Sequence, residues 1–366
     1  MKRDGFFDFL SSILVIIAGL LIGLIILLIS DAREAFPAFT TILTFGTSSM
    51  RNIGNVLLAA TPIILTGLSV AFAYKTGLFN IGATGQFMLG AYMAIYVGVE
   101  FTFLPPAIRI MVCILVAAVA GALWGAIPGL LKALFNVHEV IACIMTNYIA
   151  MYLVTFMIRQ NIFDQGRGTS LPLPSDSNLP SLGFHHIFVD PDGRFSNVNL
   201  GIVLAIIIAI IVYIILEKTT FGYELKACGF NRDAAKYAGI NEKRNIVSSM
   251  VICGALAGIG GALNYMNGTG LSMGVAEELA LEGFTGISVA FLGMNHPIGI
   301  IFSGAFVSYL ILGGTRIQAL GFNIELVEIV ISVIIYFCAF VFLVKSFLMN
   351  TVGRLGKESR TNEGGE

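Results

Sequence analysis

Polar residues interrupt an apolar run in the stretch "GLFNIGATGQFMLG", residues 77–90, and their types suggest a ligand chemistry. The amides of Asn80 and Gln86 can each donate and accept hydrogen bonds, which suits sugar hydroxyls or the edge of a nucleobase. Phe79 offers an aromatic face on which a base can stack. Interrupted helices at membrane depth occur where the backbone lines a cavity or is buried in protein. The stretch therefore predicts a substrate passage lined by Phe79, Asn80 and Gln86.

Two further amides in apolar runs, Asn147 and Asn264, are candidates for the same lining. A second interpretation stays open for all four amides. Instead of facing a substrate, they can bond to one another, or to the interrupted backbone, between packed helices.

Ionisable groups are absent from the middle of every apolar stretch that is long enough to span a membrane. A proton-coupled transporter normally needs a carboxylate or a His at that depth, so the sequence argues against that class. Sodium coupling is less firmly excluded, because unwound backbone carbonyls can bind the ion.

Motifs for catalysis, metals and nucleotides are missing as well. Neither HExxH nor GxxxxGK[ST] occurs, so the chain cannot bind ATP through a P-loop. The five cysteines are scattered without metal-ligand spacing, and we interpret them as reduced, small hydrophobes. We expect no catalytic residue, metal or cofactor in this chain. If it transports actively, the energy enters through another protein.

The longest charged segment, residues 217–246, contains a compact helix signal. Asn231 can cap the N-terminus, Asp233 suits the first turn, and Gly239 fits the left-handed position that ends a helix. The result is a two-turn helix with Tyr237 as an aromatic anchor. So short a helix is marginal alone, so we expect it to pack on the membrane domain or insert into a partner. The alternative is a charged loop that only fixes orientation.

The composition of the chain indicates the class of protein in which these residues are placed. Of 366 residues, 57% are hydrophobic and 12% are charged, with a mean hydropathy of +0.88. Soluble domains carry roughly a quarter charged residues, so this is an integral membrane protein in the lipid bilayer. The net charge of −1 gives no reason to expect nucleic acid as a partner.

The expected fold is an all-α polytopic bundle of about ten transmembrane helices. The candidate spans are 11–30, 55–73, 81–99, 107–131, 138–158, 199–216, 246–266, 281–294, 297–314 and 324–345, of which 281–294 is short for a full crossing. Glycines at four-residue spacing, as at Gly121, Gly125 and Gly129, predict close helix packing. A faint likeness between "GLFNIGATGQFMLG" and "GFTGISVAFLGM" fits two related halves.

Loop charges predict the orientation. Of the 21 Lys and Arg residues, 14 fall on the side of the N-terminus, which places both termini in the cytoplasm of a cell-membrane protein. Residues 160–198 then form a long external loop, and loops of this length are usually functional or disordered. We expect this loop to dock an extracytoplasmic protein, with Arg167 and Arg194 as candidate contacts.

Several motifs together resemble a known transporter family. "ELKACGFNRDAAKYAGI" is similar to the coupling loop of ABC importer permeases in the branched-chain amino acid, ribose and nucleoside branch. "TGLFNIGATGQFMLGAYMA", "VHEVIACIMTNYIA" and "GISVAFLGMNHPIG" resemble permeases for nucleosides or simple sugars that work with a basic-membrane-protein-type lipoprotein. The likeness extends from about residue 50 to 345. The first motif favours nucleosides over sugars.

The resemblance implies that residues 1–366 form one transmembrane permease domain, without its own ATPase site. Its partners would be ABC ATPase subunits that use the ATP, a second permease subunit in a homo- or heterodimer, and a substrate-binding lipoprotein. The coupling element would comprise Glu224, Lys226, Ala227, Gly229, Asn231, Arg232, Asp233, Ala234, Ala235, Lys236, Tyr237 and Gly239. Cys228 departs from the small aliphatic residue expected there, but its size is similar.

Three alternatives remain open from the sequence. One is a simple-sugar (ribose-like) permease of the same branch. Another is an ion-coupled secondary transporter that acts alone, and a third is a structural membrane scaffold. Uptake competition between nucleosides and sugars tests the first alternative. Accumulation under an imposed ion gradient without an ATPase would favour the second, and absence of transport would favour the third.

Overall fold

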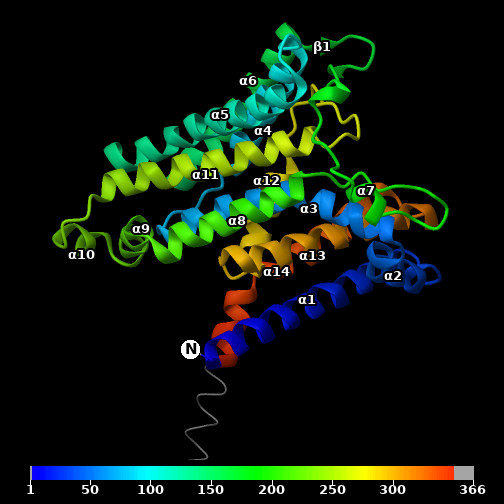
Figure 1. The fold of residues 1–366 in the computed structure, drawn as a ribbon. Coiled ribbons are helices and arrows are strands. Elements are labelled where there is room, and N and C mark those ends of the chain that lie inside the picture. The colour runs from blue at the N-terminus through cyan, green and yellow to red at the C-terminus, as the bar shows by residue number, and fades with distance from the viewer. Residues whose placement is uncertain (1, 350–366) are drawn as a thin grey trace, which may run out of the picture. The chain divides into compact units, whose positions relative to one another are not determined.

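The computed structural model describes residues 2–349, so the last 17 residues of the chain, 350–366, lie outside it. Its described residues are mainly helical, with one short hairpin as their sheet (Figure 1). They divide into two compact units. The larger unit is Phe45–Tyr309, and the smaller unit combines the segments before and after it.

The smaller unit contains α1, α2, η3 and α14, and α13 (Pro297–Arg316) runs across the boundary between the units. Within this unit, α1 packs on α14, and Gly19 and Gly23, which also have the four-residue spacing, face Ile334. The bounds are Lys2–Ser30 for α1, Ala35–Thr44 for α2, Ile317–Leu320 for η3 and Ile324–Cys338 for α14.

The larger unit is a bundle in which α11 lies against α3, α4 and α5 (Figure 1). Its elements are η1 (Phe45–Thr47), α3 (Met50–Lys75), α4 (Ala83–Glu100), α5 (Pro106–Phe135), α6 (Glu139–Asn161), β1 (Phe163–Asp164), β2 (Thr169–Ser170), η2 (Ser175–Ser177), α7 (Phe184–Ile187), α8 (Gly201–Lys218), α9 (Thr220–Phe230), α10 (Arg232–Tyr237), α11 (Glu242–Tyr265) and α12 (Leu281–Leu292).

Small residues allow the helices of this bundle to approach at backbone distance. Gly121 on α5 faces Gly254 and Gly258 on α11, and Gly258 also meets Gly90 on α4. A Cβ atom at Gly121 would collide with the carbonyl of Gly254, which is backbone and cannot move aside. The structure therefore confirms the packing role that the glycine spacing predicted.

The membrane spans agree with eight of the ten predicted segments. Seven helices in the described chain are long and apolar enough to cross a membrane, or eight if the bent pair Ile324–Cys338 and Val341–Met349 is one span. The other two predicted spans are α4 and α12. Helix α4 is surrounded by protein on nearly every side. Its side chains therefore need not be as apolar as those of a helix that faces lipid, and they include Gln86. Helix α12 has 12 residues, about 18 Å, which is too short to cross.

Candidate functional site

The helical structure is interrupted between α3 and α4, as the sequence from Gly77 onward predicted. Gly77 adopts a φ of +71°, and a Cβ there would lie 3.0 Å from the Cα of Gly229 on α9. Both the left-handed conformation and the close approach favour glycine at this position. The turn redirects the backbone so that Asn80 enters the bundle, where its side chain is fully buried.

Asn80 and Gln86 form a reciprocal amide pair. Asn80 Nδ2 donates to Gln86 Oε1 at 2.9 Å, and Gln86 Nε2 donates to Asn80 Oδ1 at 3.2 Å. Asn80 Nδ2 also donates to Ser69 Oγ at 3.1 Å, and that hydroxyl donates to the carbonyl of Cys253 at 2.8 Å. Both amides are 0% exposed. Their contact with a substrate stays a prediction, because here each amide bonds to the other.

Asn147 bridges α6 to the start of α4. Its Oδ1 accepts a hydrogen bond from the Gly85 amide at 2.9 Å, and its Nδ2 donates to the Ile81 carbonyl at 3.0 Å. The N-cap residue of α4, Gly82, has no side chain that could accept from the free amides of the first turn. Asn147 supplies that acceptor from another helix, which is the work of a helix cap.

Asn264 belongs to a different junction. Its Nδ2 lies 3.3 Å from Glu282 Oε1, so it links α11 to α12. The Glu282 carbonyl in turn accepts a hydrogen bond from Thr66 on α3 at 3.0 Å. The structure brings Asn80, Gln86 and Asn147 around one helix break and places Asn264 in a separate contact network.

Phe79 reaches a cavity of about 530 Å³ at the end of the bundle that bears residues 217–246. Its ring stacks on Phe291 of α12, with centroids 6.0 Å apart and planes 20° from parallel. Tyr74 meets the same Phe291 ring edge-on at 5.8 Å. The cavity is lined by Tyr74, Lys75, Gly77, Leu78, Phe79, Glu139, Lys226, Gly229 and Phe230. The lining of the cavity therefore includes both aromatic rings and lysine ammonium groups.

Sequence reasoning missed the neighbours of Phe79. Phe291 lies in the motif "GISVAFLGMNHPIG", which was informative only as a resemblance. In the same motif, burial and then the nearby Lys75 ammonium lower the pKa of His296. The Lys75 ammonium forms no hydrogen bond or ion pair with another residue among 2–349.

The short helix predicted after Asn231 is present as α10. Asn231 Oδ1 accepts from the Ala234 amide at 3.0 Å, as a helix cap does, and Gly239 ends the turn with a φ of +81°. Asp233 lies in the first turn of α10. Tyr237 is 95% exposed, so the anchor has no partner surface within the described chain. The preceding helix α9 was not predicted.

The helix pair α9–α10, residues 220–237, contacts the break between α3 and α4 directly. Besides the approach of Gly229 to Gly77, Arg232 lies 3.5 Å from the Gly77 carbonyl. Lys226 pairs with Glu217 at 3.0 Å. Glu224 lies 3.4 Å from the Asn245 amide on α11. The segment is thus attached at one end to the turn that leads to Phe79 and Asn80.

The outer surface of the α9–α10 pair is open. A groove of about 470 Å³ runs between the two helices, and Ala227 and Ala234 are among its lining residues. Tyr223, Phe230 and Tyr237 are 70%, 91% and 95% exposed. Exposed large aromatic side chains beside a groove are typical of a protein-binding surface.

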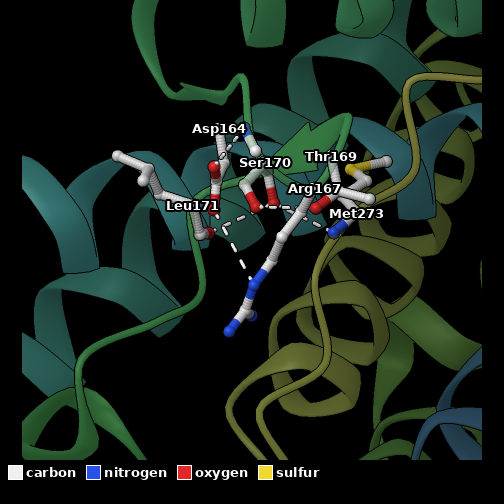
Figure 2. Close-up of polar contacts among 7 residues, drawn as sticks. Asp164, Arg167, Thr169, Ser170, Leu171 and Met273 are labelled. Atoms are coloured by element: carbon white, nitrogen blue, oxygen red, sulfur yellow. Dashed lines mark hydrogen bonds and ion pairs between the residues drawn. The ribbon is translucent and has the colours of Figure 1, made fainter.

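The 160–198 segment is folded and held to the opposite end of the bundle. Figure 2 shows Ser170 of β2 against Met273: the Ser170 amide donates to the Met273 carbonyl at 2.8 Å, and the Met273 amide donates to Ser170 Oγ at 2.9 Å. Arg167 reaches toward Asp164, 3.8 Å away, and stays 62% exposed. The hairpin is therefore stitched to the loop after α11.

An ion pair between a buried guanidinium and an exposed carboxylate fixes the same segment further along. Arg109, at the start of α5 and only 1% exposed, pairs with Asp176 in η2. Arg194 pairs with Asp192 at 3.0 Å and remains 67% exposed. Arg167 and Arg194, the two predicted docking contacts, are therefore both accessible on this face.

Comparison with known proteins decides the family. The model for "Branched-chain amino acid transport system / permease component" matches residues 52–339. The chain belongs to this family. The match covers both the broken segment after α3 and the α9–α10 pair, so the described site lies within the permease family's shared region. The chain is accordingly a multi-pass membrane permease component.

Full-length relatives are similar to this permease. It is 37% identical to the guanosine ABC transporter permease protein NupP of Bacillus subtilis, over 95% of this chain and 97% of the relative. It is 36% identical to the nucleoside ABC transporter permease protein NupB of Lactococcus lactis, over 97% of each chain. It is 30% identical to the glucose ABC transporter permease protein TsgB13 of Haloferax volcanii, over 89% and 86%. No solved structure matches significantly.

Proposed function

We propose that this permease is the membrane subunit of an ABC importer that carries nucleosides through the cell membrane. The observation that carries the proposal is the similarity to NupP and NupB, which extends over nearly the whole length of all three chains. The cavity beside Phe79 supports it, because aromatic side chains line this cavity and an aromatic ring can stack on a flat base.

The energy would come from ATPase subunits, since no P-loop occurs in the sequence, and we expect the chain to need no cofactor of its own. The second membrane subunit is proposed to be a related permease and not a second copy. Lactococcus lactis has both NupB and NupC, and Bacillus subtilis has both NupP and NupQ. The chain is similar to all four, with 28% identity to NupC and 27% to NupQ.

The α9–α10 pair is the proposed coupling element. Its aromatic side chains would enter a groove of the ATPase, and closure of the ATPase would then pull or push the pair. Because Gly229 and Arg232 contact the turn at Gly77, that motion would reach Phe79 and the Asn80–Gln86 pair. The linkage needs no long pathway, since the two elements touch.

The orientation follows from the same proposal. The face that bears residues 217–246 would be cytoplasmic, together with both termini, although Met1 and residues 350–366 lie outside the described chain. The 160–198 segment would face outward and dock the substrate-binding lipoprotein. Its fixed fold and the exposed Arg167 and Arg194 support a docking role.

Uptake in cells that express the permease with its ATPase, partner permease and lipoprotein tests the function. We expect radiolabelled guanosine to accumulate, unlabelled nucleosides to compete, and glucose and ribose to have no effect. Competition by sugars but not by nucleosides would replace the proposal with the sugar alternative, which the similarity to TsgB13 favours. Accumulation in liposomes that hold only this chain and an ion gradient would instead favour a secondary transporter.

A further inference from the structure

Helix α6 exposes one continuous stripe of large side chains. The stripe contains Ile141, Met145, Tyr148, Ile149, Tyr152 and Phe156, which recur three or four residues apart on one helical face. Tyr148 is 48% exposed and Tyr152 is 54% exposed. The opposite face of the helix is buried against α4 and α5.

The two tyrosines lie near the middle of α6, one of the helices that are long and apolar enough to span a membrane. Helix α6 has 23 residues with Ala150 at its midpoint, and Tyr148 and Tyr152 lie two residues before and two residues after it, each about 3 Å away along the helix axis. Neither phenol hydroxyl bonds to any residue among 2–349. Tyrosine normally lies at the membrane–water interface, because hydrocarbon leaves the hydroxyl unsatisfied.

Other exposed helix faces in the same unit have the composition that lipid requires. On α5, the exposed stripe is Ile108, Met111, Leu115, Val119, Leu123, Ile127, Leu130 and Leu134. On α8, it is Ile207, Ile210, Ile211 and Ile214 within the apolar part of the helix. Near the middle of its own helix, α5 exposes Val119 and α8 exposes Ile210. The α6 face therefore differs from its neighbours in chemistry and not only in shape.

A tightly packed neighbouring helix is a poor occupant for the α6 stripe. Helix contacts within lipid depend on small residues that bring backbones together, as Gly121 and Gly254 do between α5 and α11. The α6 stripe holds no Gly, Ala or Ser. Large aromatic rings with free hydroxyls fit a wet surface that contacts a ligand only in passing.

We propose that the Tyr148–Tyr152 face of α6 lines a water-filled path along which the nucleoside moves. The rings would stack on the base, and the hydroxyls would exchange hydrogen bonds with ribose or water. Only the identity of the substrate rests on the proposed function. The helix itself is held rigidly, since Asn147 bonds to the start of α4 and Trp124 Nε1 donates to the Thr146 carbonyl at 3.2 Å.

Thiol accessibility tests the path in the complete transporter. Single cysteines would replace Tyr148, Tyr152, Val119 or Ile210, and membranes would be treated with a charged, membrane-impermeant methanethiosulfonate reagent. The five native cysteines are buried, so we expect them to react slowly. Labelling of the unsubstituted chain measures this background. We expect labelling at 148 and 152 to be at least tenfold faster than at 119 and 210. Saturating guanosine should slow it at least threefold.

The outcomes separate the two proposals. Labelling at 148 and 152 as slow as at 119 and 210 would overturn the path and leave this face to lipid or to the second permease. Fast labelling that guanosine does not slow, in a transporter that imports guanosine, would overturn the ligand contact. Absence of guanosine import by the unsubstituted transporter would sink the proposed function, while the labelling rates would still decide whether the face is wet.

Transport kinetics give a second readout with matched variants. Tyr152→Leu removes the ring, and we expect about a tenfold rise in KM for guanosine, because a stacked base loses its partner. Tyr152→Phe keeps the ring and should change KM about threefold or less. The control Val119→Leu on α5 should leave KM unchanged. Equal KM values for Tyr152→Leu and Val119→Leu would overturn the stacking role.

Discussion

Two regions of this permease place polar side chains deep in the membrane, and they treat them in opposite ways. The Asn80–Gln86 pair is fully buried, and each amide satisfies the other. Tyr148 and Tyr152 are about half exposed, and their hydroxyls bond to no described residue. Sequence analysis identified the first pair as candidate site residues and did not identify the second.

The difference shows what a polar residue in an apolar run means. A group whose hydrogen bonds close within the protein stabilises the fold, because leaving it unsatisfied in a low-dielectric interior is costly. A group that stays open at the same depth needs water or a ligand. Whether a polar side chain finds its hydrogen-bond partners within the protein, and not its polarity alone, therefore distinguishes a structural residue from one that lines a passage. Four variants test this distinction.

Asn80→Leu should have the largest effect on stability. It leaves Gln86 and Ser69 without their partner inside the bundle, which we expect to cost about 3 kcal/mol of unfolding free energy. Thermal unfolding of the purified transporter in detergent and its amount in membranes would measure the loss. Asn264→Leu is the matched control, since Asn264 is only half-buried, and its effect should be smaller. Unchanged stability with lost uptake would make Asn80 a substrate contact.

Asn147→Ala should destabilise the protein less, by about 1–2 kcal/mol, because α4 loses a cap from another helix. Asn147→Asp keeps the acceptor for the Gly85 amide but loses the donor to Ile81. It also buries an unpaired carboxylate beside the Ile81 carbonyl, so its loss should be at least as large as that of the Ala variant. Hydrogen exchange at the first turn of α4 would locate the change. Faster exchange elsewhere but not there would contradict the capping role.

Much of this architecture could be predicted from the sequence, where the signals are local. The cap of α10 depends on Asn231 and residues within eight positions of it, so the prediction was confirmed. Eight of the ten span predictions also depend on nothing but length and composition. The break at Gly77 was visible because glycine and amides interrupt an apolar run.

The features that the sequence did not predict depend on contacts between distant segments. Asn80 and Gln86 are six residues apart, a spacing that brings no two side chains together on a regular helix, and only the turn at Gly77 and Gly82 joins them. No local pattern distinguishes Tyr148, which is exposed, from Asn147, which is buried. Helix packing decides that, and it also decides that Phe291 faces Phe79.

Tyr237→Ala should separate transport from stability. The side chain is 95% exposed, so we expect the unfolding free energy to change by less than about 0.5 kcal/mol. Uptake should nevertheless fall about tenfold while the ATPase still hydrolyses ATP, because a central aromatic contact with the partner is lost. Phe103→Ala, which truncates a 75% exposed ring between α4 and α5, is the control and should keep uptake. Normal uptake by Tyr237→Ala would remove the coupling role.

The smallest stability effect should come from the double variant Tyr148→Phe, Tyr152→Phe, and it returns to the opening contrast. If both hydroxyls face water, their removal breaks no bond within the protein, and stability should stay within about 0.5 kcal/mol of the parent. If the hydroxyls instead bonded to a second permease, each loss would cost about 1 kcal/mol and weaken the pair. Thermal unfolding and sizing of the complete transporter distinguish the two. Dissociation of the double variant would turn this face from a wet passage into a second satisfied pair.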